Sequence, residues 1–139
     1  MRNLTLIHGD CYFSQFVCPK NPSAHKTHLI DFETVSTSLG ADDLVFLMAT
    51  FWTPEQRAEG DREMSCLRRY HAGLGRGSVD IRRYPFEQLV EDYRLMLVWR
   101  VFHPVWDTSY GCGKGYWWPK MQSLTGAYRD WECDELFRG

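Results

Sequence analysis

The sequence predicts an α+β fold that is mostly α-helical, with the strands at the start of the chain. Three short apolar or β-branched runs come first, at residues 4–7, 16–18 and 27–30. Patterns with helical periodicity occupy most of the chain after residue 40. Strands followed by helices are typical of α+β proteins, whereas doubly wound sheets alternate the two elements.

Length and composition exclude several classes of protein. The 139 residues suffice for a single domain, 1–139, and 44% hydrophobic with 24% charged residues is a globular composition. Sixteen Lys and Arg against 18 Asp and Glu lack the basic excess of a dedicated nucleic-acid binder. No apolar run is long enough to cross a membrane, and five cysteines without a CxxC pair indicate reduced thiols. We therefore expect a cytoplasmic protein with no nucleic acid and no membrane as partner.

Residues 4–34 are expected to form a short β-hairpin unit. The runs at 16–18 and 27–30 flank Pro19–Ser23, a segment rich in proline, asparagine and serine. Because these residues favour turns, the chain is expected to reverse direction there.

The remaining part, residues 40–137, is expected to contain about four helices. Apolar residues recur at helical spacing over 44–52, and a second helix is expected from Thr53 to about His71. Thr53, Pro54 and Gln56 predict a capping box with proline at the first helical position. A third helix is expected from about Pro85 until Pro104 ends or kinks it, and a fourth from about Pro119.

The polar motif His8-Gly9-Asp10, with Gln15 five positions after the aspartate, precedes Asp31-Phe32-Glu33. If the strands pair antiparallel, Asp10, Gln15 and Asp31 converge at one end of the hairpin. Two carboxylates and an amide oxygen are hard ligands that suit Mg²⁺, and a free carboxylate can accept a proton from an attacking hydroxyl. This is the arrangement that phosphoryl transfer requires.

H-G-D-x-x-x-x-Q, I-D-F-E and the following G-A-D-D-L over about residues 6–52 resemble the aminoglycoside phosphotransferase and choline/ecdysteroid kinase group. These are small-molecule relatives of the protein kinases. The resemblance implies the C-terminal lobe of a protein-kinase-like fold, with the hairpin carrying the catalytic and metal loops. It implies an ATP-dependent phosphotransferase acting on a hydroxyl of a small molecule. Aminoglycosides, choline-like amines, sterols and sugars are all acceptors of kinases of this type.

The resemblance also implies roles for particular residues. Asp10 becomes the catalytic base, and Gln15 and Asp31 become ligands of Mg²⁺, with ATP as phosphoryl donor. Glu33 is an additional candidate for a metal contact. The loop-structuring residues implied are His8, Gly9 and Asp43.

Two departures from the family pattern lead to a second hypothesis. Gln15 stands where the family has asparagine, and nothing upstream of the catalytic loop supplies a nucleotide-binding lobe. We therefore expect an isolated chain without activity, which needs an N-terminal lobe in the same or another polypeptide. The alternative is a non-catalytic, kinase-like remnant that acts as a binding or scaffold module.

Several residues allow competing interpretations. His8 could ligate zinc with Cys11, Cys18, His25 or His28, although the spacing matches no standard finger. Cys11 could be a nucleophile beside His8, or an ordinary loop cysteine. The glycines at 73–77 follow a helical pattern, which favours a turn over a phosphate loop.

The helical part carries further ambiguous residues. Asp42 and Asp43 are typical of a helix N-cap, and Asp43 also fits a loop-pinning role. Glu87, Glu91 and Asp92 suit either a cationic acceptor or a solvated helix face. An aromatic cluster suits either the core or an acceptor pocket. Its members are Trp99, Phe102, Trp106, Tyr116, Trp117 and Trp118.

Overall fold

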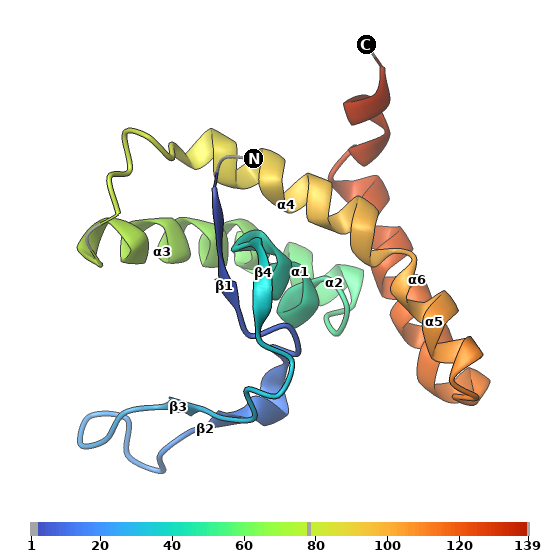
Figure 1. Ribbon diagram of the computed structural model, residues 1–139, viewed down its shortest axis with the longest axis horizontal. Coiled ribbons are helices and arrows are strands. Elements are labelled where there is room, and N and C mark those ends of the chain that lie inside the picture. Colours follow the sequence, from blue (N-terminus) through green and yellow to red (C-terminus); the bar gives the residue numbers. More distant parts are fainter. Residues whose placement is uncertain (1–2, 78, 139) are drawn as a thin grey trace.

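The computed structural model describes residues 3–77 and 79–138. Within these residues the chain forms two small antiparallel sheets and six α-helices, which confirms the mostly helical α+β prediction (Figure 1). The strands are β1 (Leu4–Ile7), β2 (Phe16–Val17), β3 (His28–Leu29) and β4 (Ser36–Leu39). The helices are α1 (Ala41–Met48), α2 (Pro54–Ala58), α3 (Arg62–Arg76), α4 (Phe86–Arg100), α5 (His103–Ser109) and α6 (Lys114–Asp130). Three 3₁₀ turns, η1 (Phe13–Gln15), η2 (Glu59–Asp61) and η3 (Cys133–Phe137), complete the described elements.

One strand pairing was expected from the sequence and the other was not. β2 and β3 form the hairpin, with Phe16 opposite Leu29, and this hairpin extends away from the helices (Figure 1). β1 instead pairs with β4, from Leu4 opposite Leu39 to Ile7 opposite Ser36. Strand β4 was not expected, because Ser36–Leu39 has no apolar alternation. Its pairing with β1 returns the chain to the start of α1, directly beside the polar motifs.

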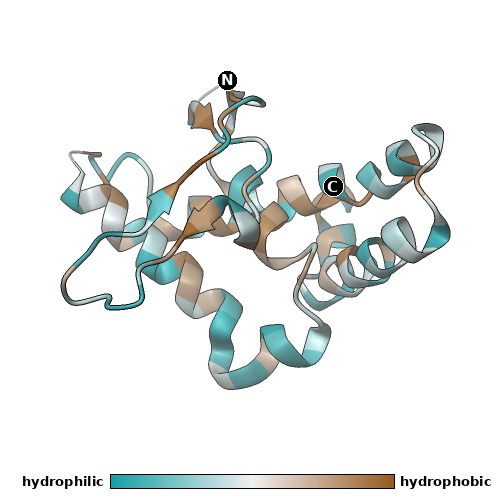
Figure 2. Ribbon diagram, turned by 90° about the horizontal axis from the view of Figure 1, so that it is seen from below, coloured by the Kyte–Doolittle hydropathy of each residue, from teal (hydrophilic) through white to brown (hydrophobic). Residues whose placement is uncertain are grey.

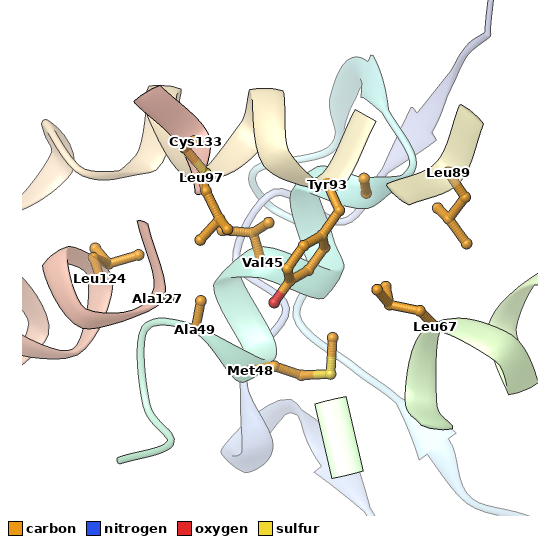
Figure 3. Close-up of a cluster of buried hydrophobic side chains, with 11 residues drawn as sticks. Val45, Met48, Ala49, Leu67, Leu89, Tyr93, Leu97, Leu124, Ala127 and Cys133 are labelled. Atoms are coloured by element: carbon orange, nitrogen blue, oxygen red, sulfur yellow. The ribbon is translucent and has the colours of Figure 1, made fainter. Parts of the chain in front are cut away.

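The core forms where α1 packs against α4, with α3 and α6 completing it (Figure 3). Val45 and Met48 of α1 and Tyr93 and Leu97 of α4 are fully buried or nearly so. Complete burial of such a side chain contributes about 1.5–3 kcal/mol. The core therefore fixes α1, whose first turn carries the acidic residues next to the candidate site.

The predicted second helix is interrupted. Its capping box is confirmed, because Thr53 Oγ1 accepts a hydrogen bond from Gln56 N and Gln56 Oε1 accepts one from Thr53 N. However, Gly60 has φ of 59° and Asp61 has φ of 55°, both in the left-handed region. A residue in this conformation ends a right-handed helix. The chain therefore forms α2, a 3₁₀ turn and then α3, which continues to Arg76 and is capped by Gly77.

The later helices differ from the prediction at their ends. α4 ends at Arg100, and Pro104 lies in the first turn of α5, where a missing amide hydrogen has little cost. α6 starts at Lys114 and includes Pro119 in its interior. The core interpretation of the aromatic cluster is wrong for five of its six members. The exposed members are Trp99, Phe102, Trp106, Tyr116 and Trp118.

Most helices carry both hydrophobic and hydrophilic segments along their length (Figure 2). This mixture is typical of amphipathic helices that pack one face on a core. Among the residues that the structure describes, no helix is long and apolar enough to cross a membrane.

Candidate functional site

The His8–Gly9 backbone is anchored to the first turn of α1. The Asp43 carboxylate accepts hydrogen bonds from His8 N at 2.7 Å and from Gly9 N at 2.9 Å. Asp43 was interpreted as an N-cap, but Gly40 is the N-cap residue and makes no side-chain cap bond. The same correction applies to Asp42, which is buried in the first turn. Because α1 belongs to the core, Asp43 fixes the segment that leads into Asp10.

Gly9 occupies a conformation and a space that favour glycine. Its φ is 84°, and a Cβ added there would lie 2.4 Å from the backbone oxygen of Thr34. Thr34 Oγ1 also donates a hydrogen bond to His8 O at 2.9 Å. The loop of Asp10 and the loop of Asp31 thus touch at this point.

The buried His8 ring connects the same two loops. Its Nε2 donates to Ile30 O at 2.7 Å, and the ring lies 4.8 Å from that of Phe32. Ile30 immediately precedes Asp31, so this bond fixes the start of the second motif. With Nε2 committed to a main-chain oxygen, His8 acts as a structural link between the motifs.

Asp10, Gln15 and Asp31 come together around the Gln15 amide. Gln15 Nε2 lies 3.2 Å from Asp10 Oδ2 and 3.2 Å from Asp31 Oδ2. Gln15 is only 5% exposed and lies at the end of η1, where Ile30 N donates to its main-chain oxygen at 3.0 Å. Asp31 has φ of 63°, in the left-handed region that aspartate adopts more readily than most residues. The convergence expected from the sequence is present, at one end of the β2–β3 hairpin.

The donor set fits a hard divalent cation. Two carboxylates and one carboxamide face a common point, and Gln15 now presents its NH₂ group to both acids. A half-turn of this amide would present Oε1 instead, which gives the oxygen ligands that Mg²⁺ prefers. Glu33 is exposed and makes no described side-chain bond at the site. Within residues 3–77 and 79–138, no three His, Cys, Asp or Glu side chains group as a metal site.

A cavity of about 270 Å³ opens beside Asp10 on the side of the helices. Its wall includes Gly9, Phe46, Arg100, His103 and Lys120. Burial and the nearby Arg100 guanidinium lower the pKa of His103, which keeps its ring neutral at neutral pH. A substrate in this cavity would lie next to the Asp10 carboxylate.

Arg100 is a site residue that the sequence analysis missed. Its Nε lies 2.6 Å from Asp42 Oδ1, and both side chains are buried. Its Nη2 lies 3.4 Å from Gly9 O, and its guanidinium stacks 4.5 Å from the Phe46 ring centre. The only sequence signal was a basic residue at the end of an apolar helix, which usually indicates solvent exposure.

The competing assignments gain no support from the geometry. Burial, together with the Asp43 and Asp10 carboxylates, raises the pKa of Cys11 to about 11, so its thiol stays protonated and is a poor nucleophile. Asp92 is buried and accepts hydrogen bonds from Tyr84 at 2.8 Å and Gln88 at 3.0 Å, so it does not face an acceptor. All five cysteines are free.

Fold and motifs together define a protein of the kinase-like, choline kinase-like type. Residues 1–103 match the sequence model of a family described as "Uncharacterized oxidoreductase dhs-27", and the chain belongs to this family. The matched range includes both polar motifs and Arg100. Neither a search of curated proteins nor a search of solved structures found a significant match.

Proposed function

We propose that this chain is the C-terminal lobe of an ATP-dependent phosphotransferase that phosphorylates a hydroxyl of a small molecule. The convergence of Asp10, Gln15 and Asp31 around one point supports this proposal most strongly. Phosphoryl transfer needs a proton acceptor and cation ligands close together, and these three residues offer both. The finer relationship, to aminoglycoside phosphotransferases and choline/ecdysteroid kinases, is part of the proposal.

In the proposed reaction, the acceptor oxygen bonds to the γ-phosphorus of ATP while the bond to the bridging oxygen of ADP breaks. The hydroxyl proton passes to the Asp10 carboxylate, and ADP leaves. Mg²⁺, held by Asp31 and Gln15, would supply neutralisation of the phosphate charge. The residues of this chain thus orient the acceptor and take up its proton.

The cavity beside Asp10 favours an acceptor without net charge. Its two cations are already paired, Arg100 with Asp42 at 2.6 Å and Lys120 with Asp107 at 3.2 Å. Lys120 Nζ also lies 3.7 Å from the centre of the Tyr116 ring, so one face of this ring is already occupied by a cation. A neutral hydroxylated molecule would meet hydrogen-bonding groups without disturbing either pair.

The phosphates of ATP need a positively charged partner, and none of the four lysines of this chain is free beside Asp10 to provide it. Lys120 is paired with Asp107, and Lys114 stacks 5.2 Å from the Trp118 ring centre. Lys20 and Lys26 lie in the exposed segment between β2 and β3. We therefore infer that a nucleotide-binding lobe, in the same or another polypeptide, supplies the phosphate-binding lysine.

One observation favours the second candidate, a non-catalytic binding or scaffold module. The Gln15 NH₂ group already donates hydrogen bonds to both Asp10 and Asp31, so both carboxylates have a partner without a cation. In such a module the amide would keep this orientation at every metal concentration. The two candidates therefore differ in what happens to Gln15 when a divalent cation is added.

Titration with Mn²⁺, a paramagnetic substitute for Mg²⁺, tests this difference by NMR. We expect selective broadening of the Gln15 side-chain amide, and its loss in Asp31→Asn because a main ligand is removed. Asp61→Asn is the matched control, since Asp61 is also exposed and left-handed, with φ of 55°. Gln15→Asn should retain broadening at the site, and Glu33→Gln tests the additional contact. No broadening near Gln15, or equal broadening in Asp31→Asn, would refute the metal site and favour the scaffold.

A further inference from the structure

The His8–Gly9 dipeptide has all four of its polar main-chain groups bound by side chains. Asp43 accepts both amide hydrogens, at 2.7 and 2.9 Å. Thr34 Oγ1 donates to His8 O at 2.9 Å, and Arg100 Nη2 lies 3.4 Å from Gly9 O. A loop in which side chains rather than a sheet satisfy every backbone group is held in one conformation by those side chains.

Arg100 acts on the carbonyl immediately before Asp10. It is only 5% exposed, and the ion pair with the buried Asp42 and the Phe46 ring fixes its guanidinium. Because the Gly9 carbonyl belongs to the peptide that ends at Asp10 N, its orientation sets the direction in which Asp10 leaves the loop. The end of α4 thereby controls a residue 90 positions earlier in the chain.

Thr34 acts from the opposite side, three residues after Asp31. Its hydroxyl holds His8 O, while its backbone oxygen occupies the space next to Gly9 that a side chain would need. The position of Asp31 relative to Asp10 therefore depends on this contact as well as on Gln15.

We propose that Arg100 and Thr34 are positioning residues, which set the separation and orientation of Asp10 and Asp31 by clamping the His8–Gly9 backbone. The functional meaning of this clamp rests on the proposed role of Asp10. Neither residue exchanges a proton or binds the cation. Their effect is transmitted through Gly9 O and His8 O.

Thr34→Val tests the clamp without removing a buried charge. It keeps the shape of the side chain and deletes the hydroxyl, whereas Thr34→Ser keeps the hydroxyl. We expect Thr34→Val to accelerate hydrogen exchange at the His8 and Gly9 amides about fivefold, the equivalent of one net hydrogen bond. Its Mn²⁺ affinity should fall by a similar factor. Thr34→Ser should restore both to within about twofold of the original protein.

Arg100→Lys tests the other half of the clamp. Arg100→Met would leave Asp42 buried without its ion-pair partner and could prevent folding. A lysine preserves the charge but lacks the second nitrogen that reaches Gly9 O while the first holds Asp42. Amide exchange at Gly9 should again rise about fivefold, with exchange of Val45 and Leu97 in the core unchanged.

Thr37→Val is the control, because Thr37 is an exposed threonine of β4. The clamp is refuted if Thr34→Val and Thr37→Val have the same exchange rates at His8 and Gly9, or if Thr34→Ser fails to rescue. If the original protein binds no Mn²⁺, the proposed metal site is refuted. The hydrogen-exchange rates at His8 and Gly9 still test whether Thr34 and Arg100 hold the backbone. If Mn²⁺ binds and Thr34→Val has no effect on it, the proposed function stands and the positioning role is wrong.

Discussion

Gly9 is the residue at which side-chain size and backbone conformation most directly limit the candidate site. Its positive φ favours glycine, and the Thr34 oxygen fills the position of a Cβ. Gly60 offers a natural comparison, because its φ is 59° and no atom lies within 4 Å of an added Cβ. The two glycines thus separate the effect of backbone strain from that of close packing.

We expect Gly9→Ala to lower the free energy of unfolding by about 2–3 kcal/mol, since strain and displacement of Thr34 add. Gly60→Ala should cost about 1 kcal/mol, from strain alone. Urea unfolding of both variants measures the difference, and Gly9→Ala should also lose Mn²⁺ broadening at Gln15. An equal decrease in the free energy of unfolding of the two variants would mean that Thr34 can move aside without loss of stability.

At the scale of elements, the sequence predicted what local patterns encode. The Thr53 capping box and the four helical regions follow from nearest-neighbour spacing, and the structure has a helix in each region. Strand β4 was missed because Ser36-Thr37-Ser38 has no apolar alternation, and only its pairing with β1 makes it a strand. The break at Gly60 was missed because a single glycine within a helical pattern is usually tolerated.

The residues of the candidate site also fall into two groups, those that the local sequence predicts and those that depend on contacts between distant parts of the chain. Asp10, Gln15, Asp31 and Asp43 were predicted because they belong to one short motif region of the sequence. Arg100 was not, because its partners Asp42 and Gly9 lie 58 and 91 positions away. The spacing of apolar and polar residues along the sequence does not predict a contact between residues so far apart. An acceptor pocket was one of two interpretations of the aromatic cluster, and Tyr116 of that cluster lines the cavity beside Asp10, which forms only when α4, α5 and α6 assemble.

A buried network connects α3, α4 and the end of α6. Glu63 accepts hydrogen bonds from Tyr93 and from Trp131 Nε1, and its carboxylate lies 3.5 Å from Arg57. Burial is the largest influence on this carboxyl and raises its pKa, while the hydrogen bonds and Arg57 oppose that change. The folded protein therefore holds the Glu63 proton more tightly than the unfolded chain does.

This raised pKa predicts a direction of pH dependence. Above the ordinary glutamate pKa of 4.5 the unfolded chain releases the proton first, so the contribution of Glu63 to stability is lost as pH rises. The stability of the original protein relative to Glu63→Gln should thus fall between pH 4 and pH 7. Glu55 provides the opposite control, because a hydrogen bond with Thr53 lowers its pKa. The stability of the original protein relative to Glu55→Gln should therefore rise as the pH increases up to about 4.5 and stay level above it. Urea unfolding would contradict the assignment if the Glu63 difference failed to fall above pH 4.5, or if the Glu55 difference fell as pH increased.

The whole molecule exposes apolar residues around the candidate site. Leu6 of β1 is 74% exposed, and Val17 of β2 and Phe32 next to Asp31 are also exposed. Apolar residues gathered beside a polar site are typical of a surface that contacts another protein or lobe. Their position fits the nucleotide-binding lobe that the proposed function requires.

The proposed function therefore predicts that this chain alone binds Mg-ATP poorly. Phosphate charge would be neutralised by Mg²⁺ alone, without the lysine of a second lobe. We expect calorimetry on the purified chain to show no binding at micromolar concentrations of Mg-ATP. A clear micromolar dissociation constant would show that no further lobe is needed to hold the nucleotide.

The role of Asp10 is the central claim, and phosphate transfer tests it most directly. With the chain joined to the nucleotide-binding lobe that the proposed function requires, γ-labelled ATP, added Mg²⁺ and a low-molecular-weight cell extract depleted of organic cations should yield a labelled small molecule. Asp10→Asn preserves the shape of the side chain but removes the proton acceptor, so the rate should fall about 10²–10⁴-fold while the KM for ATP changes little. Transfer at an undiminished rate in Asp10→Asn would contradict the account.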